Sequence, residues 1–147
     1  MSRGIAAVIL AAGAGSRMRS ALPKPLHTVA GRPMIDLVID AIDTVRPAVV
    51  VVVLSPALVA NNDIVAHLEM RLGERLRIAT QAEPRGTGDA LLSAMPFLED
   101  ADAVMVAFAD HPLLEAESIS KLIAALGTNG APLALLTCVH PDGGGFG

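Results

Sequence analysis

The sequence predicts an α/β fold in which helices cover both faces of an open, mainly parallel β-sheet. Five short runs rich in apolar residues recur along the 147 residues. The segments between these runs repeat apolar residues at the spacing of a helix. Strands that are buried on both faces appear as continuous apolar runs. The alternation of such runs with helical segments along the chain is typical of parallel strands joined by right-handed helical crossovers. The expected order is therefore β-α-β-α-β-α-β-α-β, within one domain that spans residues 1–147.

The predicted strands differ in how completely apolar they are. Val49–Leu54 and residues 103–109 are nearly continuous apolar runs, as expected for the centre of a parallel sheet. The other three are Ile5–Leu10, Leu76–Thr80 and residues 133–139. Cys138, the only cysteine, lies in the last run, and we expect it to be a small buried side chain without a catalytic role.

Four segments are predicted to be helices from their apolar spacing and their end signals. Pro33 suits the start of the first helix, which begins near residue 35. Gly73 suits the end of the second helix after residue 72, and Gly127 suits the end of the last one after residue 126. The third is shorter and follows Gly88. The four segments are residues 35–42, 64–72, 90–95 and 119–126.

The bulk composition excludes several classes of function. A net charge of −4 argues against a general nucleic-acid binder, which normally carries a basic surplus. One cysteine and four scattered histidines do not form a zinc pattern. The N-terminus lacks the pattern of a signal peptide, and no apolar run is long enough to cross a membrane, so we expect a cytoplasmic protein without a membrane partner.

A glycine-rich loop from Leu10 to Gly31 follows the first predicted strand. Gly13 and Gly15 allow backbone N–H groups to approach an anion, and Arg17 and Lys24 supply positive charge. A dinucleotide-binding loop is excluded, because Met18 stands at the position of its third glycine and Ser55 and Pro56 stand where it needs an acidic residue. A Walker A loop is excluded because its Gly-Lys-Ser/Thr sequence is absent. Taken alone, the glycine pair is equally compatible with an ordinary strand-to-helix turn.

The continuation of this loop carries a family resemblance. Residues 10–18 are LAAGAGSRM, residues 22–27 are LPKPLH and residues 30–34 are AGRPM. Together they resemble the nucleotidyltransferases that make nucleotide sugars (nucleotide-sugar pyrophosphorylases), whose loop has Thr where this chain has Ser16. They most resemble the uridyltransferase half of the bifunctional enzyme that makes UDP-N-acetylglucosamine and carries a glucosamine-1-phosphate acetyltransferase half.

Two further segments match the same family in the same order. Residues 81–88, QAEPRGTG, resemble the family's uracil-binding segment. Gln81 offers a donor and an acceptor, and Gly86 allows the backbone to approach a ligand closely. Thr87 caps the next helix or donates to the base. Asp110 follows a buried strand, where a carboxylate needs solvent, a partner or a metal. The family places a metal-binding Asp here, after a Gly that this chain replaces with Ala109. We expect no role for His111.

The resemblance implies a Rossmann-like nucleotide-diphospho-sugar transferase fold, of which this chain holds the front part without the acetyltransferase β-helix domain. The implied reaction transfers UMP from UTP to N-acetylglucosamine 1-phosphate with Mg²⁺ as cofactor, which would make the chain an enzyme of cell-envelope (peptidoglycan) precursor synthesis. Arg17 and Lys24 would be catalytic, Asp110 would bind the metal and Gly147 the sugar. The nucleotide-binding residues would be Leu10, Ala11, Ala12, Gly13, Gly15, Gln81, Gly86 and Thr87.

Two alternatives remain open at this stage. One is an enzyme of the same fold that uses another base or acceptor, such as a molybdopterin-cofactor guanylyl- or cytidylyltransferase. The other is a truncated form that binds a nucleotide without turnover. Oligomeric state is not indicated by any pattern in the sequence.

Overall fold

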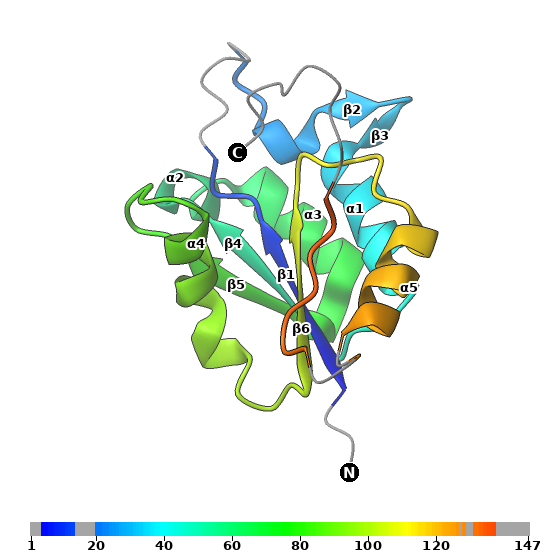
Figure 1. The fold of residues 1–147 in the computed structure, drawn as a ribbon. Coiled ribbons are helices and arrows are strands. Elements are labelled where there is room, and N and C mark those ends of the chain that lie inside the picture. Colours follow the sequence, from blue (N-terminus) through cyan, green and yellow to red (C-terminus); the bar gives the residue numbers. More distant parts are fainter. Residues whose placement is uncertain (1–3, 14–19, 127, 129–130, 138–147) are drawn as a thin grey trace, which may run out of the picture.

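The computed structural model describes residues 4–13, 20–126, 128 and 131–137. Its centre is a parallel sheet of four strands in the order β5-β4-β1-β6 (Figure 1). The strands are β1 (Ile5–Leu10), β4 (Val49–Leu54), β5 (Leu76–Thr80) and β6 (Ala103–Phe108). Ala7 of β1 pairs with Val50 on one side and Met105 on the other, and every neighbouring pair in this sheet is parallel. The predicted open, parallel α/β fold is confirmed.

Helices cover both faces of the sheet, as the sequence predicts. The expectation that residues 103–109 lie at the centre is wrong, because β6 is an edge strand of the described sheet and Val104, Val106 and Phe108 are exposed. α1 (Met34–Asp43), α3 (Asn62–Leu72) and α5 (Ala116–Ala125) share one core with the sheet, through side chains such as Ile35, Ile64 and Ile119. α4 (Thr87–Ala94) covers the other face, where Ala90 and Ala94 pack with alanines and valines of β1 and β4. A short helix, α2 (Pro56–Val59), follows β4. Within the described ranges, no helix combines the length and the hydropathy needed to cross a membrane.

The valine run of β4 is buried because the strand lies inside the sheet between β1 and β5. Residues 50–54 are 0% exposed, and their side chains alternate between the two cores. Complete burial of one such side chain contributes roughly 1.5–3 kcal/mol, so this strand contributes strongly to the stability of the domain. It therefore gives a rigid base to the loops that follow the strands.

A small hairpin between the first loop and α1 was not predicted. Its strands, β2 (Thr28–Val29) and β3 (Arg32–Pro33), pair antiparallel, and a 3-10 helix, η2 (Lys24–Leu26), precedes them. Ala30 and Gly31 have positive φ angles of 51° and 81°, as in the two-residue turns that connect hairpins. Strands of two residues are too short to show an alternating pattern, which is why periodicity does not indicate them.

The prediction of a strand at residues 133–139 is wrong for its described part. Residues 133–137 form no strand, and Leu133, Leu135 and Leu136 are exposed. An apolar run becomes a strand only where a neighbouring strand accepts and donates ladder hydrogen bonds, and in the described part of the chain β6 pairs with β1 alone. Residues 138 and 139, and with them Cys138, lie outside the described residues.

The bounds of all four predicted helices shift by one to three residues at one or both ends. α4 begins at Thr87 and ends at Ala94, so Gly88 lies inside the helix, and a second short 3-10 helix, η4 (Met95–Phe97), follows it directly. α3 ends at Leu72 and Gly73 is its C-cap, as the predicted stop at this glycine implies, with a φ of 54°. Another 3-10 helix, η3 (Gly73–Arg75), leads from there into β5. α5 ends at Ala125, and Gly127 lies outside the described residues.

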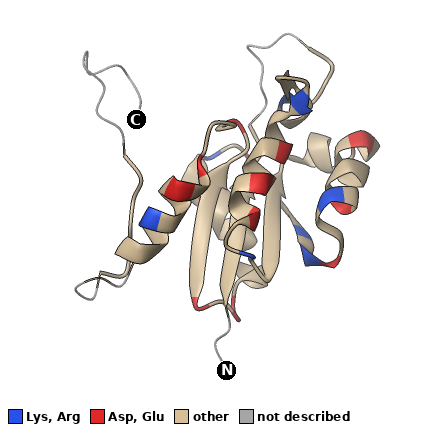
Figure 2. Ribbon diagram, turned by 90° about the vertical axis from the view of Figure 1, so that its right-hand side faces the viewer, with Lys and Arg blue, Asp and Glu red and all other residues tan. Residues whose placement is uncertain are grey.

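A row of ion pairs joins α1 to α3 and η3. The aspartates at positions 36, 40 and 43 lie on one face of α1. α1 is the central helix of Figure 2, and acidic positions follow one another along it. Asp36 is 9% exposed; it lies 2.7 Å from His67 Nε2 and 3.2 Å from Arg71 Nε. Asp40 lies between Arg71 and Arg32, at 2.5 Å from each, and Arg32 belongs to the hairpin. The row therefore connects the hairpin, α1 and α3.

Replacing Asp36 should destabilise the fold. We expect Asp36→Ala to lower the free energy of unfolding by about 2–3 kcal/mol, because hydrogen bonds to charged groups contribute roughly 1.5–3 kcal/mol and the partners would stay partly buried without them. Glu117→Ala is the matched control, since Glu117 forms an exposed ion pair with Lys121 that contributes at most about 1 kcal/mol. Urea denaturation measures both variants, and equal losses would contradict the role of Asp36.

Candidate functional site

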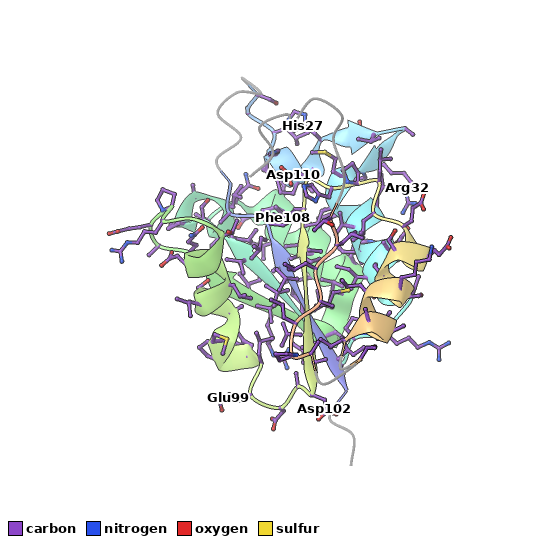
Figure 3. The ribbon with its side chains drawn as sticks, viewed as in Figure 1. His27, Arg32, Glu99, Asp102, Phe108 and Asp110 are labelled. Atoms are coloured by element: carbon purple, nitrogen blue, oxygen red, sulfur yellow. The ribbon has the colours of Figure 1, made fainter. Side chains whose placement is uncertain are left out.

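A cavity of about 400 Å³ opens at the carboxyl ends of the four strands. The chain runs from β1 to β4 and on to β5 on one side of β1, and the next crossover leads from β5 to β6 on the other side of β1. The strand order therefore changes direction at β1. Ligands of open α/β sheets bind at such a switch point. In Figure 3, Phe108 and Asp110 lie at this end of the sheet, whereas Glu99 and Asp102 lie at the opposite end.

The structure gathers the expected site residues around this one cavity. Every one of them that falls in the described part of the chain is in its lining: Leu10, Ala11, Ala12, Gly13, Lys24, Gln81, Gly86, Thr87 and Asp110. These residues come from four separate segments, which follow β1, β5 and β6 or belong to η2. Gly15, Arg17 and Gly147 lie outside the described residues.

The loop after β1 is held by hydrogen bonds to both neighbouring strands. The Ala11 N–H donates to the Val53 carbonyl at 2.9 Å, and the Ala109 N–H donates to the Leu10 carbonyl at 3.0 Å. A Cβ atom at Gly13 would meet nothing within 4 Å, so the backbone there borders open space. The described residues 10–13 therefore have a fixed root and border open space at Gly13, which is compatible with a backbone that cradles phosphate.

Lys24 and Asp110 meet across the cavity although 86 residues separate them in sequence. The Lys24 Nζ donates to Asp110 Oδ2 at 2.5 Å. Lys24 lies at the start of η2, where Pro23 precedes it and Pro25 follows it, and the prolines restrict the backbone at this point. Asp110 is the second residue after β6, so the end of this strand sets the position of its carboxylate.

The surroundings of Asp110 keep its carboxyl ionised. Burial raises the pKa of Asp110, but the hydrogen bond and charge of Lys24 and the charge of His111 lower it more, so the net pKa lies below the ordinary value. The His111 ring lies 4.9 Å from the Phe108 ring, and its Nε2 is 3.9 Å from Asp110 Oδ1. His111 is thus a neighbour of the carboxylate, a contact that the sequence did not indicate.

Asp110 supplies the kind of ligand that Mg²⁺ prefers. Within the described ranges, no group of three or more His, Cys, Asp or Glu residues could enclose a metal, and Asp110 is the one carboxylate in the lining of the cavity. Mg²⁺ at nucleotide sites is commonly held by one or two carboxylates, while phosphate oxygens and water complete its shell. The donor set fits a metal that arrives with a nucleotide.

Gln81 is buried at the end of β5, beneath the turn that leads into α4. Its exposed fraction is 8%, and its Nε2 donates to the Gly86 carbonyl and to Asp89 Oδ2, each at 3.0 Å. Gly86 has a φ of 110°, which favours glycine, and it is the N-cap of α4. Thr87 is the first residue of the helix, so the expectation that it caps the helix is wrong; the positive φ of the cap position excludes a threonine there.

Sequence reasoning missed several residues of this site. Asp89 was not considered, although an acid three positions after a helix-capping glycine lies in the first turn and faces back toward the loop. Ser55 and Pro56 served to exclude a dinucleotide site, yet both line the cavity. Ala109 is 3% exposed and also borders the cavity, so the methyl group that replaces the family's glycine fits this ligand-free structure.

Two curated proteins cover nearly the whole chain. The chain is 41% identical over 143 residues to the bifunctional protein GlmU of Alcanivorax borkumensis. This alignment covers 97% of this chain and 30% of that protein. It is 42% identical over 142 residues to the bifunctional protein GlmU of Latilactobacillus sakei, with coverages of 96% and 29%. The chain therefore spans less than a third of the length of these relatives.

Solved structures show the same fold at low sequence identity. The 4-diphosphocytidyl-2C-methyl-D-erythritol synthase of Anaerococcus prevotii superposes with a TM-score of 0.65 at 21% identity, over 83% of this chain and 50% of that one. A manganese complex of Rv0371c from Mycobacterium tuberculosis superposes with a TM-score of 0.59 at 16% identity, over 85% of this chain and 60% of that one. The profile of the MobA-like NTP transferase domain matches residues 7–144. The resemblance to nucleotidyltransferases is thus confirmed, and the chain belongs to the family of MobA-like NTP transferase domains.

Proposed function

We propose that this chain binds UTP and N-acetylglucosamine 1-phosphate and transfers UMP to the sugar phosphate. The observation that carries the proposal is that Gln81, Lys24 and Asp110 surround one cavity at the switch point of the sheet. They supply a group that can recognise a base, a cation for phosphates and a carboxylate for a metal. The similarity to GlmU proteins supports the choice of nucleotide and acceptor.

The proposed reaction is a displacement at the α-phosphorus of UTP. A phosphate oxygen of the sugar phosphate forms a bond to this phosphorus, and the bond to the bridging oxygen of pyrophosphate breaks. The attacking phosphate is already ionised, so no general base is needed, and catalysis depends on positioning and on stabilisation of charge. The Lys24 ammonium would hold the triphosphate and the leaving pyrophosphate. Arg17 would share this task, and Gly147 would contact the sugar.

Asp110 would hold Mg²⁺, which neutralises charge on the phosphates when it is bound. Gln81 and Gly86 would recognise uracil, and Thr87 would approach the same base from the start of α4. The backbone of residues 10–13 would lie along the nucleotide, since the loop is open toward the cavity.

The proposal is tested by measuring nucleotide binding and pyrophosphate release across substrates. Calorimetry with Mg²⁺ complexes of UTP, CTP, GTP and ATP should show the tightest binding for UTP. Pyrophosphate release should require both UTP and N-acetylglucosamine 1-phosphate. UTP binding without release would indicate a nucleotide-binding form that does not turn over. Preference for CTP or GTP, or release with another acceptor only, would contradict the proposal.

A further inference from the structure

We infer that Asp89 determines base selection by fixing the orientation of the Gln81 amide. This inference rests on the proposed function, because it assigns the means by which that site prefers uracil to cytosine. Asp89 does not line the cavity, so it acts through Gln81 as a positioning residue.

The hydrogen bonds of Gln81 leave one orientation for its amide. The amide nitrogen has two hydrogens, and both are donated, one to the Gly86 carbonyl and one to the Asp89 carboxylate. A carbonyl and a carboxylate are both acceptors only. A turned amide would therefore place its oxygen against two other oxygens. The donors of Gln81 are used internally, and its carbonyl oxygen Oε1 is the group left for a ligand.

The partners of Gln81 are themselves held in place. The Gly86 carbonyl also accepts the Ala90 N–H at 3.1 Å, the first hydrogen bond of α4, and the Gln81 N–H donates to the Leu54 carbonyl at 2.9 Å. Asp89 belongs to the first turn of the same helix. Since Gln81 is 8% exposed, water cannot readily replace a lost partner, and a turned amide would carry the cost of buried unsatisfied groups.

The two pyrimidines differ at the position that this oxygen would meet. Uracil carries a hydrogen on N3 and can donate it to Gln81 Oε1. Cytosine has a lone pair on N3, which would face the same oxygen with repulsion. A fixed acceptor therefore favours uracil, whereas a freely rotating amide could present its nitrogen to cytosine and lose discrimination.

The test compares base selectivity in two variants of Asp89. Asp89→Ala removes one of the two acceptors that fix the amide and leaves the Gly86 carbonyl, so a turned amide becomes less costly. Asp89→Asn keeps an acceptor oxygen of the same reach. We expect the ratio of Kd values for Mg·CTP and Mg·UTP, measured by calorimetry on the whole chain, to fall about tenfold in Asp89→Ala, a change of about 1.4 kcal/mol. The ratio in Asp89→Asn should stay near that of the wild type.

A control separates this role from helix stabilisation, because an acid in the first turn also interacts with the helix dipole. Asp63→Ala removes a first-turn acid from α3 and should leave the ratio unchanged. Thermal unfolding of all variants shows which of them remain folded. If Asp89→Ala stays folded and keeps the wild-type ratio, the inference is overturned while the proposed function stands. A wild-type chain that prefers CTP, or binds neither nucleotide, overturns both.

Discussion

Lys24→Ala is expected to lower kcat/KM for pyrophosphate release by on the order of 100-fold, as loss of one group that stabilises developing charge commonly does. The Lys24 ammonium is the cation that the described part of the chain places in the cavity, at 2.5 Å from Asp110. Its removal takes away the charge that would hold the triphosphate. It also leaves the Asp110 carboxylate without its partner, so the cavity becomes repulsive toward phosphate.

Two further variants define what this experiment shows. Lys24→Arg keeps the charge but changes its shape, and we expect it to retain more activity than Lys24→Ala. Lys121→Ala is the matched control, because Lys121 is an exposed lysine of α5 that pairs with Glu117 outside the cavity lining. Kinetics of Lys24→Ala close to those of the wild type would remove Lys24 from the proposed mechanism.

Asp110→Asn is expected to abolish the dependence of UTP binding on Mg²⁺. The amide keeps the size of the side chain but lacks the negative charge that a hard divalent cation requires. In the wild type, calorimetry should show tighter UTP binding with Mg²⁺ than with a chelator present. In the variant the affinities with and without Mg²⁺ should agree within about threefold, because most of the metal's contribution to UTP binding would be lost. A threefold ratio is well below the factor of 10 that corresponds to about 1.4 kcal/mol.

Metal-free UTP gives an additional signature of Asp110. In the ligand-free structure this carboxylate holds Lys24, so it competes with the triphosphate for the ammonium. Asp110→Asn should therefore bind metal-free UTP at least as tightly as the wild type. Asp102→Asn is the control, because Asp102 lies at the opposite end of the sheet in Figure 3. An unchanged Mg²⁺ dependence in Asp110→Asn would exclude Asp110 from the metal site.

The inner part of the sheet could be predicted because β1 and β4 are buried on both faces. The run Val49–Leu54 has little alternative to an inner strand, and helical spacing in the segments between the strands indicated the crossovers. The run at residues 133–137 shows the limit of this reasoning. Hydrophobicity identifies a segment that can be buried, but burial as a strand also depends on a neighbouring strand, and that depends on the tertiary arrangement.

The sequence indicated the residues of the candidate site one by one, but not the contacts between them. Motif chemistry indicated Gln81, Lys24 and Asp110 separately, because each residue type suits a base, a phosphate or a metal. The ion pair between Lys24 and Asp110 depends on how η2 packs near the end of β6, which no local pattern encodes. Asp89 was missed for a related reason. Its partner Gln81 lies eight residues earlier, just after β5, so the contact exists only once α4 has turned back onto the sheet.

The ion pair between Lys24 and Asp110 also bears on how the empty cavity is prepared. A lysine side chain loses roughly 1.5–2 kcal/mol of conformational entropy when it is fixed. Here the carboxylate oxygen gives the ammonium the contact that a phosphate oxygen would give in the proposed complex. The lysine is therefore ordered during folding, before a nucleotide arrives. In the proposed complex a phosphate would replace Asp110 as the partner of Lys24. The ordered lysine would lower the entropic cost of the first encounter with ligand, while the exchange would still cost the ion pair.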